Sequence, residues 1–139
     1  MTPTPHDIPK ADSLMRYQTQ QYVRWGDLDA FGHVNNATYL VYAQEARYTW
    51  SKMIEMVVAR AEVDFIAPIY TGDIFIDVEI WVNKIGNSSF GLTYEMKNGD
   101  EVLARIKTVQ VTVSMETKKS RPLKDSEREF LTKYLEEEK

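Results

Sequence analysis

The sequence predicts an α+β domain in which one antiparallel sheet packs on a single long helix. Two observations support this prediction. Apolar residues recur at helical spacing after residue 37, and in several later stretches they alternate with polar residues, as in strands that have one buried face. These later strands are separated by short turns rather than by helices, which is typical of an antiparallel sheet. A helix on one side of such a sheet gives the α+β class.

Length and composition point to one globular domain. A chain of 139 residues fits a single domain with a substantial core. The net charge of −4 argues against nucleic acid as the main partner. No apolar run approaches the roughly 18 residues of a membrane-spanning helix, so no membrane partner is expected. Cysteine is absent, which excludes disulfides and thiolate sites and favours a cytoplasmic location.

The N-terminal third is expected to hold a tail, a strand and a helix. Residues 1–13 are predicted to be a flexible tail, because three prolines discourage regular structure. Side chains alternate from Met15 to Trp25, which predicts a strand. From residue 37 the spacing predicts a long, largely buried helix, with Asn35 or Asn36 as its N-cap. The apolar stripe of this helix comprises Tyr39, Ala43, Ala46, Trp50 and Met53.

A second strand is predicted from Val57 to Ile66, directly after the helix. No Gly, Pro, Asn or Asp separates the two elements, although chain reversals normally carry such residues. Either the turn lies between Ser51 and Met56, or the printed chain lacks a loop at this point.

Three more strands follow, with a strong hairpin signal at Asn98-Gly99. In the last of them the apolar positions shift by one residue, which predicts a bulge near Lys107-Thr108. The predicted strands span residues 74–83, 90–96 and 102–114.

The C-terminal residues 124–139 are predicted to form a charged helix packed on a domain that spans residues 14–123. Phe130, Leu131 and Leu135 would attach this helix, while its acidic side chains face solvent. The predicted sheet keeps an unpaired edge. Exposed edges are usually paired or covered, so a homodimer is expected.

The stretch Arg24–Asn36 joins the first strand to the helix and is the candidate functional site. A helix N-terminus presents unpaired N–H groups and the positive end of the helix dipole. Asp27, Asp29 and His33 offer few ligands for a metal, because His6 is the single other histidine, so neither a metal nor another cofactor is expected. The sequence also lacks the G-x-S-x-G motif of serine hydrolases.

This stretch resembles the start of hotdog-fold acyl-CoA thioesterases of the 4-hydroxybenzoyl-CoA thioesterase type. The resemblance rests on Arg24-Trp25-Gly26-Asp27-Leu28-Asp29 followed by Gly32-His33-Val34-Asn35-Asn36, and then on Tyr39 and Glu45-Ala46-Arg47. It is closest to the long-chain acyl-CoA thioesterase subgroup and extends over roughly residues 15–123. The resemblance implies an antiparallel sheet wrapped around one helix. It also implies a homodimer, often paired into a homotetramer, with active sites at subunit interfaces.

The resemblance also implies roles for single residues. Asp29 matches the catalytic carboxylate, which acts either as a nucleophile or as a general base. The backbone N–H of Asn36 matches the donor to the oxyanion. The alternative for Asp29 is a loop cap, and Asp27 is expected to be structural. Candidate contacts to the acyl-CoA substrate are Gly32, His33, Asn35, Tyr39, Arg60, Ser88 and Ser89.

Several of these contacts have a structural alternative. His33 and Asn35 either touch substrate or hold the loop by hydrogen bonds. Ser88 and Ser89 are either turn residues or contacts to CoA, and Tyr39 either lines an acyl tunnel or packs in the core. Other functions compatible with the fold are hydrolysis of acyl-carrier-protein thioesters and non-catalytic binding of acyl thioesters.

Overall fold

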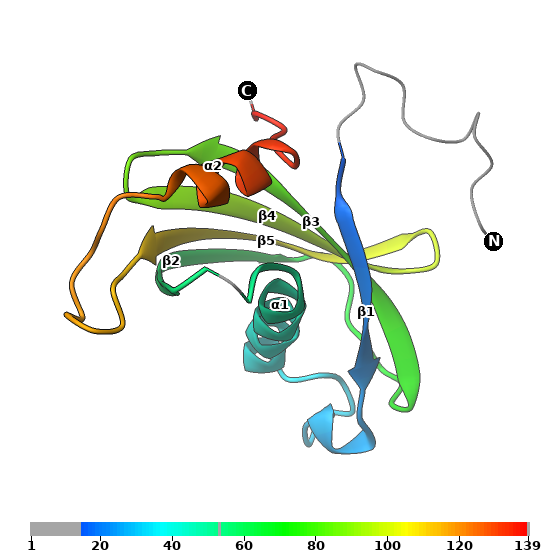
Figure 1. Cartoon of the computed structure of the whole chain (residues 1–139). Coiled ribbons are helices and arrows are strands. Elements are labelled where there is room, and N and C mark those ends of the chain that lie inside the picture. The colour runs from blue at the N-terminus through cyan, green and yellow to red at the C-terminus, as the bar shows by residue number, and fades with distance from the viewer. Residues whose placement is uncertain (1–14, 53, 139) are drawn as a thin grey trace, which may run out of the picture.

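The computed structural model describes residues 15–52 and 54–138 (Figure 1). The predicted tail at residues 1–13, and Met53 of the predicted helix stripe, lie outside this part of the chain. The described elements are β1 (Tyr17–Val23), a short 3-10 turn (Trp25–Asp27), α1 (Asn36–Ser51), β2 (Met56–Phe65), β3 (Ile74–Ile85), β4 (Ser89–Asn98), β5 (Glu101–Thr112) and α2 (Asp125–Thr132).

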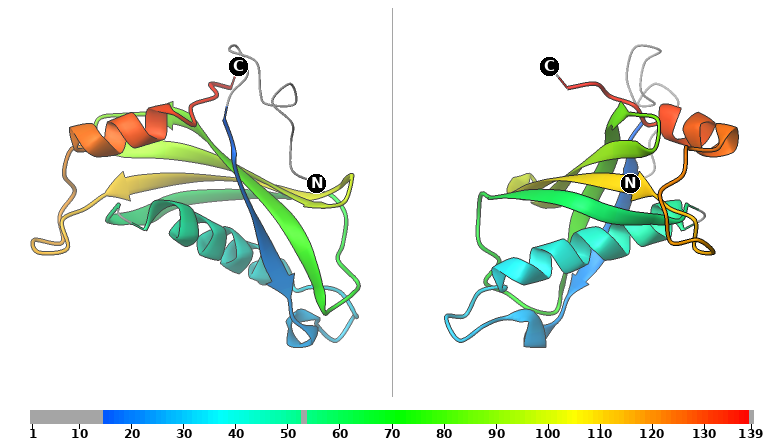
Figure 2. Two further views of the ribbon diagram at one scale, coloured as in Figure 1. Left: turned by 45° about the vertical axis from the view of Figure 1, so that its right-hand side comes forward. Right: turned by 90° about the vertical axis from the view of Figure 1, so that its left-hand side faces the viewer.

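The strands form one antiparallel sheet in the order β1-β3-β4-β5-β2. The sheet curves around α1, which lies across its concave face (Figures 1 and 2). β4 and β5 form a hairpin at Asn98-Gly99, where Gly99 takes a positive φ of 63°. The predicted α+β fold, a sheet wrapped around one long helix with a short C-terminal helix, is therefore confirmed.

The core lies between α1 and the inner face of the sheet. The helix contributes Tyr39, Ala43, Ala46 and Trp50, which confirms the described part of the predicted stripe. The central strands contribute fully buried side chains that alternate along the chain: Ile76, Val78, Ile80 and Val82 from β3, and Phe90, Leu92, Tyr94 and Met96 from β4. None of the described helices has the length and apolar character needed to cross a bilayer.

The predicted bulge near Lys107-Thr108 was wrong. The inward phase of β5 continues through Ile106 into the buried polar side chains of Thr108, Gln110 and Thr112. The valines of this stretch point to the other face. Burial of these polar groups costs little because each is hydrogen-bonded; Gln110 Nε2, for example, donates to the Phe90 carbonyl at 3.1 Å. Register shifts lie instead between Val58/Arg60, Val82/Lys84 and Met96/Lys97.

The predicted C-terminal helix is too long, because α2 ends at Thr132. The following segment pairs with the edge of β3: Val82 N–H donates to Tyr134 O at 2.9 Å and Glu136 N–H donates to Val82 O at 2.7 Å. The acidic side chains of the predicted C-terminal helix do not all face solvent either. Glu127, Glu136 and Glu138 form ion pairs with Arg121, Arg16 and Lys107, respectively. The division of the chain at residues 13 and 123 stays a prediction.

The connection between α1 and β2 is short. Lys52 caps the helix in a helical conformation, and Ile54 N–H donates to Ser51 O at 2.9 Å before β2 begins at Met56. In the given chain the turn therefore lies between Ser51 and Met56.

Candidate active site

Asp27 ties the loop between β1 and α1 to the helix. Its Oδ2 accepts the Arg24 N–H at 3.0 Å and the Tyr42 hydroxyl at 2.7 Å. The Asp27 side chain is only 9% exposed. Burial, together with this hydrogen bond to a carboxylate, raises the pKa of Tyr42, so its hydroxyl remains a donor. Asp27 thus has a structural position, as the sequence predicts.

Residues 29–33 form a tight turn that presents Asp29. Gly32 N–H donates to Asp29 O at 3.0 Å, and Asp29 N–H donates to His33 O at 2.8 Å. Gly32 has a φ of +81°, a conformation that side chains with a Cβ rarely adopt. Val34 N–H then donates to Ile69 O at 2.8 Å, which anchors the turn to the segment before β3.

The two carboxylate oxygens of Asp29 contact different neighbours. Oδ1 accepts the Phe31 N–H at 2.8 Å, which is the loop-capping contact foreseen as an alternative. Oδ2 lies 3.5 Å from His33 Nδ1, and the Asp29 side chain is 22% exposed. His33 Nδ1 also lies 3.3 Å from the Val34 carbonyl. One carboxylate oxygen is therefore engaged by the backbone, and the other remains accessible beside an imidazole.

Asn35 is the N-cap of α1 and organises the first turn of the helix. Its Oδ1 accepts the Ala37 N–H at 2.9 Å, and its carbonyl accepts the Thr38 N–H at 2.9 Å. Among the described residues, no acceptor meets the N–H of Asn36. This group is one of the unpaired donors that a helix N-terminus leaves, and the helix dipole lies behind it.

Asn36 also lines a cavity of about 300 Å³. One side is lined by His33, Asn36 and Tyr39. The other is lined by Phe65, the last residue of β2, and by the following Ile66 and Pro68. The Tyr39 ring packs edge-on against Phe65 with 5.2 Å between ring centroids. Asp29 does not line the cavity within one chain, whereas His33, whose Nδ1 lies 3.5 Å from Asp29 Oδ2, does.

An N–H group without an acceptor among the described residues, at a helix N-terminus that follows a turn carrying a carboxylate, suits ester or thioester hydrolysis. Comparison with known proteins decides between families. Residues 23–131 match the model of the thioesterase-like superfamily. The chain belongs to this family. Membership makes it a thioester hydrolase of the hotdog fold, whereas the long-chain subgroup is not resolved by this match.

Relatives of this thioesterase agree with that assignment. A 1,4-dihydroxy-2-naphthoyl-CoA hydrolase from Synechococcus elongatus is 24% identical over 83% of this chain and 94% of its own length. A predicted thioesterase from Bacillus stearothermophilus has a TM-score of 0.83 at 25% identity, covering 90% of this chain and all of its own. A thioesterase from Thermus thermophilus, solved with coenzyme A and Zn, has a TM-score of 0.75 at 32% identity over 82% of this chain and 90% of its own.

The remaining predicted site residues of this thioesterase lie away from the cavity at Asn36. Arg60 is on β2, pairs with Glu62, and borders a separate hollow of about 280 Å³ with Lys84 and Lys107. Ser88 lies in the turn between β3 and β4, and Ser89 begins β4. The Ser88 carbonyl accepts the Thr112 N–H at 2.9 Å, and the Ser89 carbonyl accepts the Gly86 N–H at 2.7 Å. Within one chain, His33, Asn36 and Tyr39 therefore lie together at the cavity, whereas Arg60, Ser88 and Ser89 lie elsewhere.

Sequence reasoning missed the second wall of the cavity. Phe65, Ile66 and Pro68 lie about thirty residues after Asn36, and the break at Ala67-Pro68 was the single local signal. Within the described part of the chain, no group of three or more His, Cys, Asp or Glu side chains gathers at metal-binding distances.

Proposed function

We propose that this thioesterase hydrolyses acyl-CoA to a carboxylic acid and CoA. The observation that carries the proposal is the unpaired Asn36 N–H, which lies at a helix N-terminus beside a cavity and follows the turn that presents Asp29. A donor at this position suits the oxygen of a thioester carbonyl, where negative charge develops during attack. The coenzyme named for two relatives, one a CoA thioester hydrolase and one solved with coenzyme A, supports CoA as the thiol.

Asp29 would supply the attacking group in one of two ways. Its carboxylate could bond to the thioester carbon and expel the CoA thiolate, leaving a mixed anhydride that water cleaves. Alternatively it takes a proton from a water molecule, which bonds to the same carbon while the carbon–sulfur bond breaks. In both routes the Asn36 N–H holds the oxyanion of the tetrahedral intermediate. Oδ2 is the atom for this role, because Oδ1 already accepts a backbone N–H.

We further propose that a second copy of the chain completes the site. β2 is an edge strand of ten residues, and its free edge can pair with the same strand of another chain. Apolar side chains around this edge are exposed: Val57 and Val58 on β2, and Leu40, Val41 and Tyr48 on α1. Pairing along β2 would cover these groups and set a second wall beside the cavity that holds Asn36.

The hollow bordered by Arg60, Lys84 and Lys107 is a candidate for the phosphates of CoA, because basic side chains pair well with phosphate. Lys107 already pairs with Glu138 at 2.6 Å, so a phosphate would compete with that carboxylate. The resemblance to long-chain enzymes and the aryl substrate named for the Synechococcus elongatus relative suggest two acyl classes. A cytoplasmic location stays a prediction.

The test is thiol release from long-chain, short-chain and aryl acyl-CoAs, with an acyl-carrier-protein thioester included. The wild type and Asp100→Asn, a change in an exposed turn, should release thiol equally. Asp29→Ala and Asp29→Asn should lose at least about a hundredfold in kcat. Release by folded Asp29→Ala at the wild-type rate would refute the assignment of Asp29, and release from the carrier protein alone would replace CoA as the substrate.

A single turnover in ¹⁸O-water, with enzyme in excess, detects the nucleophilic route when water attacks the Asp29 carbonyl of the anhydride. Attack of water on the Asp29 carbonyl of a mixed anhydride leaves ¹⁸O in the protein, which mass spectrometry of the peptide detects. The general-base route places the label only in the carboxylic acid.

A further inference from the structure

His33 connects Asp29 with the cavity that Asn36 lines. Its Nδ1 lies 3.5 Å from Asp29 Oδ2, and the residue itself borders the cavity, which Asp29 does not within one chain. A general base must lie within hydrogen-bond reach of the water whose proton it takes. For a water in this cavity, His33 is therefore better placed than Asp29.

The neighbours of Nδ1 determine which nitrogen of His33 can take a proton. The Val34 carbonyl at 3.3 Å and Asp29 Oδ2 at 3.5 Å are both acceptors. A ring nitrogen that faces two acceptors carries a hydrogen, so the neutral imidazole is protonated at Nδ1. The lone pair then lies on Nε2, for which the described residues offer no hydrogen-bond partner. Nε2 is thus the nitrogen that can accept a proton.

Asp29 is the charged group beside this imidazole. The other ionisable side chains near the ring are Tyr70, edge-on with 6.4 Å between ring centroids, and Tyr39, which lines the same cavity. Burial raises the pKa of Tyr39, and tyrosine hydroxyls are in any case neutral near pH 7. A carboxylate at this distance favours the imidazolium that forms when Nε2 takes a proton. The Phe31 N–H holds that carboxylate in place through Oδ1.

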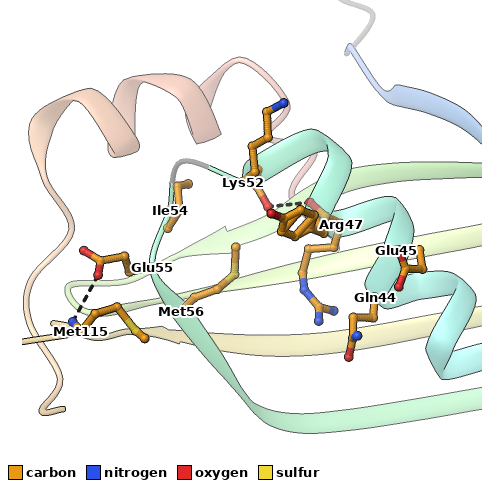
Figure 3. A pocket seen from close by; sticks show the side chains of 10 residues that line it. Gln44, Glu45, Arg47, Lys52, Ile54, Glu55, Met56 and Met115 are labelled. Carbon is orange, nitrogen blue, oxygen red and sulfur yellow. Dashed lines mark hydrogen bonds between the residues drawn. The ribbon is translucent and has the colours of Figure 1, made fainter.

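The carboxylates of the other large cavity are not alternative bases. That cavity, of about 470 Å³, lies along the second half of α1 and shares no lining residue with the cavity at Asn36 (Figure 3). Glu55, one of the two carboxylates that line it, accepts the Met115 N–H at 3.2 Å. Within one chain, the candidates for a base near Asn36 are therefore Asp29 and His33.

We propose that His33 Nε2 takes the proton of the attacking water and that Asp29 acts through His33, as a positioning residue. The inference rests on the proposed acyl-CoA hydrolysis and refines its general-base route. The water oxygen bonds to the thioester carbon while its proton moves to Nε2, and the Asn36 N–H holds the oxyanion. When the carbonyl re-forms, the carbon–sulfur bond breaks and the sulfur takes the proton from Nε2. The products are the carboxylic acid and CoA, and His33 is neutral again.

The first test is the dependence of kcat/KM on pH, which reports the essential base of the free enzyme. An imidazole base becomes inactive as it gains a proton, at about pH 6–7, whereas an ordinary carboxylate base stays active down to about pH 4. The wild type should therefore lose activity about tenfold per pH unit below pH 6. The matched control is His6→Ala, which removes the single other histidine and should leave this profile unchanged.

The second test separates proton transfer from a structural role of His33. His33→Asn keeps an N–H near the position of Nδ1, which can still donate to the Val34 carbonyl, but it cannot take a proton. Its stability to urea should match that of the wild type, while kcat falls by about 10²- to 10⁴-fold. His33→Ala should lose activity similarly, and free imidazole added to the assay should restore part of it.

Two results would overturn the inference. One is a wild type that stays folded and keeps full kcat/KM down to about pH 5, as a carboxylate base would. The other is a folded His33→Asn variant with the kcat of the wild type, which would show that His33 only holds the loop. Either result would leave acyl-CoA hydrolysis by Asp29 intact, whereas thiol release from none of the CoA thioesters would refute both proposals.

Discussion

Replacing Asn36 by proline removes the proposed oxyanion donor and little else. Asn36 is the first residue of α1, where proline is favoured because its missing N–H has no partner in the helix. Asn35 has φ −61° and ψ 138°, the extended conformation that a residue before proline prefers. The Asn36 side chain is exposed, and no acceptor for its N–H lies among the described residues.

The magnitude follows from the single bond that is lost. Removing one oxyanion donor typically costs about 2.7–4 kcal/mol of transition-state stabilisation, a loss of roughly 10²- to 10³-fold in kcat. The free energy of unfolding should change by less than about 1 kcal/mol, because proline at a compatible position does not strain the folded chain. Activity and stability therefore separate in this variant.

Steady-state thiol release at saturating acyl-CoA measures kcat, and urea unfolding measures stability. The matched control is Asn36→Ala, which keeps the N–H and removes the side chain; its kcat should stay within about threefold of the wild type. If Asn36→Pro is folded and its kcat also stays within threefold, the backbone of residue 36 is not the oxyanion donor. If Asn36→Ala is as slow as Asn36→Pro, the side chain, not the N–H, is the functional group.

Three other predictions concern the stability of the fold and its oligomeric state. Asp27→Ala should lower the free energy of unfolding by about 1–3 kcal/mol in urea titration, because the Tyr42 hydroxyl and the Arg24 N–H lose their acceptor; full stability would show that solvent replaces the carboxylate. Hydrogen bonds from Arg121 hold the pKa of Glu127 below its ordinary value, against the effect of burial. The stabilisation is therefore present above the unfolded pKa of about 4 and is lost as the pH falls through the folded pKa. Glu127→Gln should accordingly be about 2 kcal/mol less stable than the wild type at neutral pH, with the difference disappearing in acid; a difference that is constant with pH would contradict this account. Light scattering should give twice the mass of one chain or a multiple of it, and a monomer at assay concentration would refute the proposed completion of the site along β2.

The local elements could be predicted because each depends on neighbours in the chain. The spacing of Tyr39, Ala43, Ala46 and Trp50 is helical in any context, and the alternation of Ile74 to Val82 is that of a strand with one buried face. The loop could also be singled out. Gly32 provides the positive φ of its turn, and Asn35 is a strong N-cap, so both act within a few residues of their partners.

Contacts between distant residues could not be read in this way. The valines of β5 suggested a change of face, but Thr108 and Gln110 are buried because Tyr94 and the Phe90 carbonyl, from the neighbouring strand, satisfy them. Likewise the last residues continue the edge of β3 instead of extending α2, because the Val82 backbone offers them hydrogen bonds. Propensity along the chain is a weak guide where such partners exist.

The sequence alone determined the fold class and the position of the Asp29–Asn36 loop, because hydrophobic period and capping are local properties. The thioester chemistry was indicated by the resemblance of that loop to a known family. The tertiary structure decided which residues line the cavity with Asn36, and that the Asp29 carboxylate contacts the Phe31 N–H and His33. The physical reason is that burial, and the pairing of a charge, depend on segments that the chain brings together only when the sheet closes around α1.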